Sequence, residues 1–377
     1  MFSRIKHKDN IEQRNEDGIY FARPIVLIWW KFSRNKLAVI SLFILIIIYT
    51  IAIFCEFVAP SDPHAISADR VYMPPQRVHF SWENRHFYVH PHKTSFDPGT
   101  LASIHEPDTE IVVPLGLLVR GSTYRLWGLF ESDLRLFGPK DITQSDLLYL
   151  FGTDRLGRDM LSRIIFGIRI STSIGLLGIV ISFVIGILIG GISGYLGGTV
   201  DLVIQRIIEF ISCIPTFPLW MALSAALPLH WPQLYVYVGI VVVLSLVGWT
   251  EIARLVRNKF ISLREEDFVK AARLAGAGKM RIIFKHMLPS FTSFLIASMT
   301  LAIPGMILGE TTLSFIGLGL REPTISWGII LQDAQNLNSI ILYPWLFTPV
   351  IVLLITVLAF NFLGDGLRDA ADPYSIN

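Results

Sequence analysis

The sequence predicts an all-α integral membrane protein with six transmembrane helices, a cytoplasmic helix-turn-helix and a large extracytoplasmic insert between the first two helices. Two observations predict this class. The 377 residues are 52% hydrophobic and only 16% charged, whereas soluble domains carry about 25% charged residues. The apolar residues are gathered into long runs, and a helix of about 20 such residues crosses the hydrocarbon core of a bilayer.

Six apolar runs are the predicted spans. They are Leu37–Val58, Ser171–Leu196, Leu202–Leu227, Leu234–Ile252, Phe291–Ile316 and Leu346–Leu363. The third run is interrupted by Arg206, Glu209 and Pro215. It is still counted, because a charge pair in the first turns of a span can lie near the membrane interface.

Residues 1–36 form an N-terminal leader, and residues 37–58 form the first span. The leader is too long for the charged region of a cleaved signal peptide, which favours a retained signal anchor. Its basic residues predict a cytoplasmic N-terminus, because short cytoplasmic segments carry an excess of Lys and Arg. These residues are Arg4, Lys6, Lys8, Arg14, Arg23, Lys31, Arg34 and Lys36.

The charges of the later connections agree with this orientation. The connection 253–289 holds nine basic and three acidic residues, and six spans from an inside start place it in the cytoplasm. The opposite connections, 228–233 and 317–345, hold one basic residue between them, Arg321. Both termini are therefore predicted to be cytoplasmic.

Residues 59–150 form the extracytoplasmic insert. Short apolar stretches at 111–113 and 115–119 predict a small, partly ordered, β-containing structure, and the aromatic content argues against disorder. The spacing of His86, His90 and His92 fits no standard metal-ligand set, so we interpret them as solvated loop histidines.

Composition and motifs exclude several other functions. A net charge of +2 is far from that of a nucleic-acid-binding protein. Cys55 and Cys213 lie in apolar runs and are expected to be buried, inert thiols. No phosphate loop or catalytic motif is present. The last five predicted spans contain only four charged residues, namely Arg206, Glu209, Glu251 and Glu310, whereas ion-coupled transporters usually need carboxylates near mid-membrane.

The cytoplasmic connection contains the most informative pattern. Three acids at 265–267 suit the positive end of a helix that continues to Ala275. Gly276 tolerates the left-handed conformation that ends a helix. A second short helix is predicted over 279–287, before Pro289. Small residues on the first helix, Ala271, Ala272 and Ala275, would let another protein approach its backbone.

These residues resemble a known family. Lys270-Ala271-Ala272, followed by Gly276 and then by Leu288-Pro289, is similar to the "EAA" loop of binding-protein-dependent ABC importer permeases. Two positions depart from the family pattern: Lys270 replaces the usual Glu, and His286 replaces the usual Ile. The helix, its small face and the glycine turn are retained.

Three further stretches resemble the dipeptide/oligopeptide branch of this family, the C-type permease. They are residues 151–169 (beginning Phe-Gly-Thr-Asp-Arg-Leu-Gly-Arg-Asp), residues 313–328 (beginning Leu-Ser-Phe-Ile-Gly-Leu-Gly) and residues 359–373 (ending with Asp372-Pro373). Residues 151–377 would thus be the permease core, with five spans and the coupling loop 253–289.

The resemblance implies a transport subunit that is not an enzyme. It would form half of a translocation pore for di- or oligopeptides in the bacterial inner membrane, as a heterodimer with a second homologous permease. Two cytoplasmic ABC ATPase subunits would bind ATP and magnesium and dock on the coupling loop, so this chain itself would hold no cofactor or metal. A substrate-binding protein would deliver the peptide. The alternatives are a single-chain secondary peptide transporter and a membrane-embedded enzyme.

The segment 151–169 suggests a second site. Gly152 and Gly157 suit tight turns, and the segment mixes both signs of charge beside the outer interface. Asp154, Arg158, Asp159 and Arg163 are predicted to brace an outer gate or to contact the partner permease. The alternative is a headgroup-level anchor for the second span. The insert would contact the binding protein or cover the partner permease passively.

Overall fold

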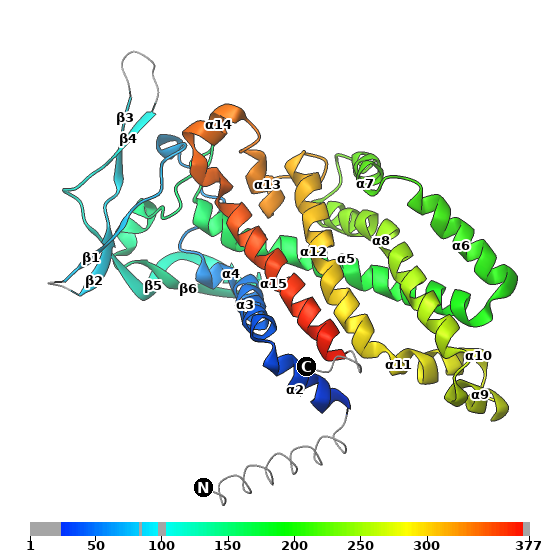
Figure 1. The fold of residues 1–377 in the computed structure, drawn as a ribbon. Helices are drawn as coiled ribbons and strands as arrows, with labels where there is room; N and C mark the ends of the chain where they lie inside the picture. The colour runs from blue at the N-terminus through cyan, green and yellow to red at the C-terminus, as the bar shows by residue number, and fades with distance from the viewer. Residues whose placement is uncertain (1–23, 83–84, 97–102, 372–377) are drawn as a thin grey trace, which may run out of the picture. The chain divides into compact units, whose positions relative to one another are not determined.

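The computed structural model describes residues 24–82, 85–96 and 103–371. Helices make up most of these residues (Figure 1). The chain divides into two compact units: residues up to 45 with 263–302 and those from 357 onward, and residues 46–262 with 303–356. The leader up to Arg23 and the predicted motif residues Asp372-Pro373 lie outside the described residues.

Within the described residues, five helical stretches are long and apolar enough to cross a membrane. They are α3 (Lys36–Ile53), α5 (Met160–Leu196), α8 (Gln233–Leu263), α12 (Thr292–Phe315) and Pro344–Ala371, which joins η4 (Pro344–Phe347) to α15 (Thr348–Ala371). Three of them are longer than predicted. α5 begins before Ser171, α8 continues past Ile252 and α15 continues past Leu363, because hydropathy marks the hydrocarbon-spanning part of a helix and not its polar ends.

The third predicted span, Leu202–Leu227, is not one continuous helix. α6 (Gly198–Ser212) and α7 (Thr216–Ala225) meet at an angle of 80°. Pro215 stands directly before α7, and its missing N–H and fixed φ prevent the hydrogen-bond ladder from continuing. The described residues therefore hold five spans, or six if this bent pair counts as one. Cys213 lies at the bend and is exposed, contrary to expectation, whereas Cys55 is buried.

Glycines bring α5 and α8 into backbone contact. Gly186, Gly190 and Gly194 lie four residues apart and so share one face of α5. A Cβ added at Gly190 would lie 2.4 Å from the carbonyl oxygen of Ala253, and one at Gly194 would lie 2.7 Å from that of Arg257. The glycine-rich end of α5 is therefore a face for close packing against a neighbouring helix.

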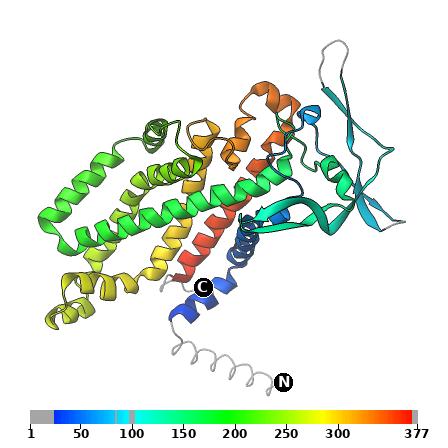
Figure 2. The ribbon, with the colours of Figure 1, turned by 180° about the vertical axis from the view of Figure 1, so that it is seen from behind.

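The insert contains strands, so the class "all-α" applies to the helical part alone. The strands are β1 (Val78–Ser81), β2 (His86–Val89), β3 (His92–Phe96), β4 (Ser103–Pro107), β5 (Val113–Leu126) and β6 (Phe130–Pro139). Antiparallel pairing gives one sheet in the order β1-β2-β5-β6 and a separate β3-β4 pair. The hairpin of β5 and β6 contacts α4 (Cys55–Val58), just beyond α3 (Figure 2).

The remaining helices outside the connection 253–289 are short. They are α2 (Pro24–Arg34), η1 (Ala68–Arg70), η2 (Ile142–Leu147), α13 (Trp327–Gln332) and α14 (Leu337–Leu342). A buried cluster around Met160, Ile164, Ile330 and Leu346 joins the start of α5 to α13 and η4.

Candidate functional site

A turn with two glycines precedes α5. Gly152 and Gly157 have φ of +73° and +71°, the left-handed region that favours glycine. The space around Gly157 is also closed, because an added Cβ would lie 1.9 Å from the carbonyl oxygen of Ser67. Between the glycines, the Thr153 amide donates to Met73 O at 2.9 Å, and the Thr153 hydroxyl accepts from the Met73 amide at 2.8 Å. The turn is thereby bound to the first part of the insert.

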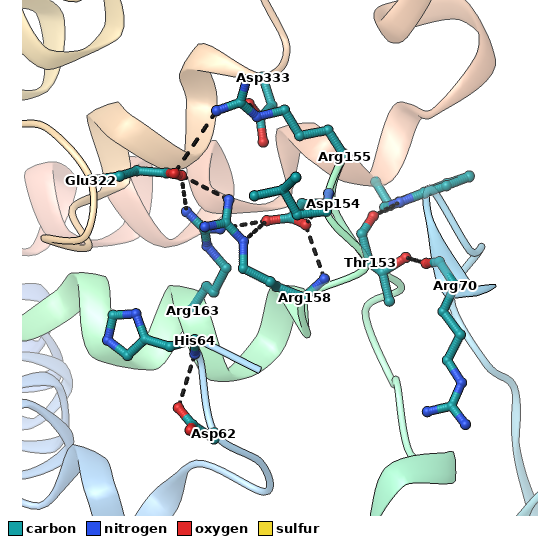
Figure 3. A network of polar contacts seen from close by, with 12 residues as sticks. Asp62, His64, Arg70, Thr153, Asp154, Arg155, Arg158, Arg163, Glu322 and Asp333 are labelled. Atoms are coloured by element: carbon teal, nitrogen blue, oxygen red, sulfur yellow. Dashed lines mark hydrogen bonds and ion pairs between the residues drawn. The ribbon is translucent and has the colours of Figure 1, made fainter. Parts of the chain in front are cut away.

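Asp154 is the centre of a charged cluster, which we call the Asp154 network (Figure 3). Its Oδ1 accepts from the amides of Leu156 and Arg158 at 2.8 and 3.0 Å. Its Oδ2 accepts from Arg158 Nε at 2.7 Å and from Arg163 Nη1. The side chains of Asp154 and Arg163 are each only 1% exposed. Two guanidinium groups and two amides therefore hold a carboxylate that water does not reach.

Two acids from the stretch between α12 and η4 complete the network. Glu322 Oε1 accepts from Arg158 Nη2 at 2.7 Å and from Arg163 Nη2 at 3.3 Å. Asp333 pairs with Arg155 at 2.9 Å. The network thus joins the segment before α5 to the segment after α12 within one compact unit.

The surroundings shift the pKa values of these acids in opposite directions. Partial burial raises the pKa of Glu322, but its bonds and charge interactions with Arg158 and Arg163 outweigh this, and the net shift is downward. Burial raises the pKa of Asp333 to about 6, and the attraction of Arg155 opposes this only in part. Glu322 is therefore held as a carboxylate, whereas Asp333 changes charge near neutral pH.

Asp333 should make the stability of the folded chain decrease as the pH rises. Its pKa is higher in the folded chain than the ordinary value of 3.8, so the folded state binds more protons between about pH 4 and 6, and this contribution to stability is lost as the pH rises through that range. We expect the melting temperature in detergent of Asp333→Asn minus that of the parent chain to increase from pH 4 to pH 7. A constant difference across this range would contradict the assignment. Asp133→Asn, at a more exposed carboxylate, is the control.

The structure separates Asp159 from the other three predicted residues. Asp159 caps α5: its Oδ2 accepts from the Ser162 amide at 2.9 Å and from Ser61 Oγ at 3.0 Å. Burial raises its pKa, against the opposing effect of these bonds. Asp154 contacts both Arg158 and Arg163, and Glu322 is a further partner of both arginines. Asp159 instead ties the start of α5 to the residues that follow α4.

Sequence reasoning missed Glu322 and Asp333. A signal was present, because the segment 154–163 contains three arginines and only two aspartates, and Asp159 is used as a helix cap. A buried excess of positive charge requires a carboxylate from elsewhere in the chain. The sequence alone did not indicate which distant acid would supply it.

Glu310 lies in α12 and is fully buried. It accepts from Ser171 Oγ at 3.1 Å and from Ser314 Oγ at 2.8 Å. Each of these hydroxyls also accepts a backbone amide, from Trp327 at 3.1 Å and from Leu320 at 3.0 Å respectively. Through these two hydroxyls, Glu310 fixes the chain after α12 against α5.

The connection 253–289 carries the second candidate site, in its residues from 263 onward, which belong to the other compact unit. α9 (Asp267–Leu274) packs against η3 (Ile282–Met287), a π-helical segment between α10 (Lys279–Arg281) and α11 (Leu288–Ser290). The predicted second helix, 279–287, is therefore present but is largely not α-helical. Pro289 lies in the short α11, and Leu288 beside it is half-buried.

One side of α9 is buried and the other is open. Val269 is fully buried, whereas Lys270 and Ala271 are exposed and Ala272 is half-buried. Leu274 is 90% exposed, and sequence reasoning did not single it out. Phe268 of the same helix is 42% exposed, so the open side of α9 carries two large apolar side chains, of which Leu274 is the more exposed.

Gly276 ends α9 in the predicted way. Its φ is +77°, its amide donates to Arg273 O at 3.0 Å, and the Ala277 amide donates to Ala272 O at 3.1 Å. This pair of bonds defines the Schellman motif, whose left-handed position favours glycine. An added Cβ would meet no atom within 4 Å, so the requirement for glycine comes from the backbone and not from lack of space.

Comparison with known proteins identifies the family. A family model described as binding-protein-dependent transport system inner membrane component matches residues 184–375, and one described as the N-terminal TM domain of oligopeptide transport permease C matches residues 24–75. The chain belongs to this family of membrane-spanning transport subunits. Its relatives narrow the family to the dipeptide and oligopeptide permeases called C, which confirms the predicted branch.

Three relatives illustrate the likeness. The dipeptide transport system permease protein DppC of Lactococcus lactis is 32% identical over 98% of this chain and 95% of its own length. The oligopeptide permease OppC of Haemophilus influenzae is 39% identical over 60% of this chain and 70% of its own. DppC of Bacillus subtilis is 40% identical over 59% and 68%. A solved structure of the inward-facing MetNI methionine ABC transporter matches 56% of this chain and 98% of its own chain, with 20% identity and a TM-score of 0.43.

Proposed function

We propose that this chain is one half of the translocation pore of an ATP-driven importer for di- or oligopeptides. A second homologous permease would form the other half, two cytoplasmic ATPase subunits would bind ATP and magnesium, and a substrate-binding protein would deliver the peptide. The similarity to a dipeptide permease over 98% of the chain supports the cargo class. Both termini and the connection 253–289 would lie in the cytoplasm of a bacterium, as the distribution of basic residues indicates.

The exposed face of α9 is the observation that carries this proposal. Lys270, Ala271, Ala272, Gly276, Leu288 and Pro289 form the ATPase-coupling loop of the proposal. A surface of small side chains admits a close partner backbone, and the exposed Leu274 supplies apolar area that a partner would bury. With no Glu at position 270, docking would depend on the shape of α9 rather than on an ion pair there.

At the outer side, we propose that the Asp154 network braces the extracytoplasmic gate. Asp154, Arg158 and Arg163 would keep the start of α5 and the segment after α12 together while the cavity opens and closes. Burial of Asp154 and Arg163 supports a bracing role within the chain over contact with a partner permease. Asp159 would contribute by capping α5.

Affinity purification of the tagged chain from gently solubilised membranes tests the assembly. A second permease and one or two ATPases in stoichiometric amounts are expected. A chain that purifies alone and transports peptide with its own activity would contradict the proposal. Uptake that survives ATP depletion but collapses with the proton gradient would favour a single-chain secondary transporter instead.

Substitution of Gly276 tests the coupling role. Valine at this position would occupy a φ of +77°, which β-branched residues avoid, so the end of α9 would be re-shaped. We expect Gly276→Val to insert normally and to allow ATP hydrolysis while peptide uptake is lost. Gly278 is the matched control, because it also has no atom within 4 Å of an added Cβ but has a φ of −67° that valine adopts readily. Normal coupled uptake by Gly276→Val, measured in proteoliposomes, would remove α9 from the coupling mechanism.

A further inference from the structure

An apolar groove lies between the outer half of α3 and the β5–β6 hairpin. Its volume is about 750 Å³. The helical side is lined by Ile46, Ile47, Thr50, Ile51, Phe54, Phe57 and Val58, and the hairpin side by Tyr124, Leu126, Phe130, Ser132, Leu134 and Leu136. None of these residues is charged. All of them belong to the same compact unit.

One face of the hairpin lines the groove. The four residues of β6 that line it are alternate residues, 130, 132, 134 and 136, and alternate residues of a strand share a face. Two of them pair across the strands with lining residues of β5: Leu126 with Phe130, and Tyr124 with Ser132. The opposite face carries charges, including the exposed pair Arg125–Glu131. The hairpin is therefore amphipathic, with its apolar face toward α3.

Two hydrogen bonds hold the hairpin at the end of the span. Trp127 Nε1 donates to the carbonyl oxygen of Ile53, the last residue of α3, at 2.7 Å. Arg135 Nη1 donates to Ala59 O at 2.6 Å, and Arg135 is only 3% exposed. The turn of the hairpin is apolar and open, with Leu129 75% exposed and Phe130 62% exposed. Trp127 thus lies where membrane proteins place their interfacial aromatic residues.

The length of α3 determines where in the membrane the groove lies. Ile46 is ten residues beyond Lys36, where α3 begins, and at 1.5 Å per residue this is about 15 Å along the axis. A hydrocarbon core about 30 Å thick therefore places the wall from Ile46 to Ile53 in the outer half of the core. Water does not occupy this depth, so the groove must be filled by something apolar.

We propose that the groove binds an acyl chain of a phospholipid from the outer leaflet, with the hairpin lying in the headgroup region above it. The groove is continuous with the exposed surface of α3, where Ile46 and Ile47 are 53% and 43% exposed, and this surface faces lipid in a membrane-spanning subunit. The proposal is independent of the peptide cargo and of the ATPases.

A photoreactive residue in the groove distinguishes the occupants. In the assembled transporter in its native membrane, Leu134→p-benzoylphenylalanine is expected to gain, on irradiation, the mass of one phospholipid. Leu117, on β5 outside the groove and 79% exposed, is the matched control position and is expected to give no lipid adduct. A crosslink from position 134 to a second permease would overturn the proposal in favour of a partner helix. The absence of any lipid adduct at position 134 would also overturn it.

A second experiment does not depend on the photoreactive side chain. The purified transporter is reconstituted in phosphatidylethanolamine and phosphatidylglycerol vesicles with a trace of phosphatidylcholine that carries a diazirine on its acyl chain. Residues 124–136 are expected to be labelled in the parent chain. Ser132→Trp, which places a large side chain in the groove, should reduce this label while Leu117→Trp leaves it unchanged. Labelling that is absent in the parent chain, or that is not reduced in Ser132→Trp, would show that the groove holds no acyl chain.

Discussion

Replacing Asp154 with alanine is expected to prevent the chain from accumulating in folded form. The substitution leaves the guanidinium groups of Arg158 and Arg163 in place, with side chains 8% and 1% exposed. Removal of one partner from a buried ion pair costs about 3–5 kcal/mol, because the remaining charge stays out of water without compensation. Glu322 is the one remaining carboxylate within 4 Å of both arginines among the described residues, and its side chain is 36% exposed. It cannot replace the acceptor sites that Asp154 gives to two backbone amides.

The amount of monodisperse protein after detergent extraction and its melting temperature measure this effect. Asp133→Ala is the matched control: its carboxylate pairs with Arg120 at 3.8 Å, and both side chains are largely exposed. Exposed pairs contribute about 0–1 kcal/mol, so this variant should behave like the parent chain. Equal yields and melting temperatures for the two variants would mean that the Asp154 network does not hold the fold together.

The membrane-spanning helices could be predicted from the sequence because the bilayer imposes a single requirement, about 20 apolar residues per span. α3 and α12 follow this rule closely. The rule says nothing about helix beyond the hydrocarbon, which is why the first turns of α5 and the last turns of α8 were missed. It also ignores backbone hydrogen bonding. The run Leu202–Leu227 therefore met the hydropathy requirement, although Pro215 interrupts the hydrogen bonds of the helix there.

The candidate sites were predictable to different degrees for a physical reason. The end of α9 depends on residues within a few positions of one another, and the acids at 265–267 together with Gly276 predicted the helix and its left-handed end. The Asp154 network depends on contacts between residues more than 150 positions apart, such as Arg158 and Glu322. Local patterns carry no information on such pairings. The sequence predicted strands in the insert, but not that one face of the β5–β6 hairpin would lie against α3.

Gly190→Ala is expected to disrupt the packing of α5 against α8, although it adds a single methyl group. The added Cβ would lie 2.4 Å from the carbonyl oxygen of Ala253 and 2.9 Å from its Cα. These are backbone atoms of a second helix and cannot rotate away as a side chain can. One of the two helices must therefore move as a whole. Insertion of a methylene into a well-packed interior costs about 1–3 kcal/mol, and a backbone collision belongs at the upper end of this range.

Gly305→Ala in α12 separates this collision from the general effect of replacing glycine. An added Cβ at Gly305 has no atom within 4 Å, and alanine in a helix interior is favoured over glycine by about 0.5–1 kcal/mol. The melting temperature in detergent should therefore fall for Gly190→Ala and stay equal or rise for Gly305→Ala. A fall of equal size in both variants would indicate that the helices respond to the loss of any glycine, and the close approach of α5 and α8 would then have no special part in holding the two spans together.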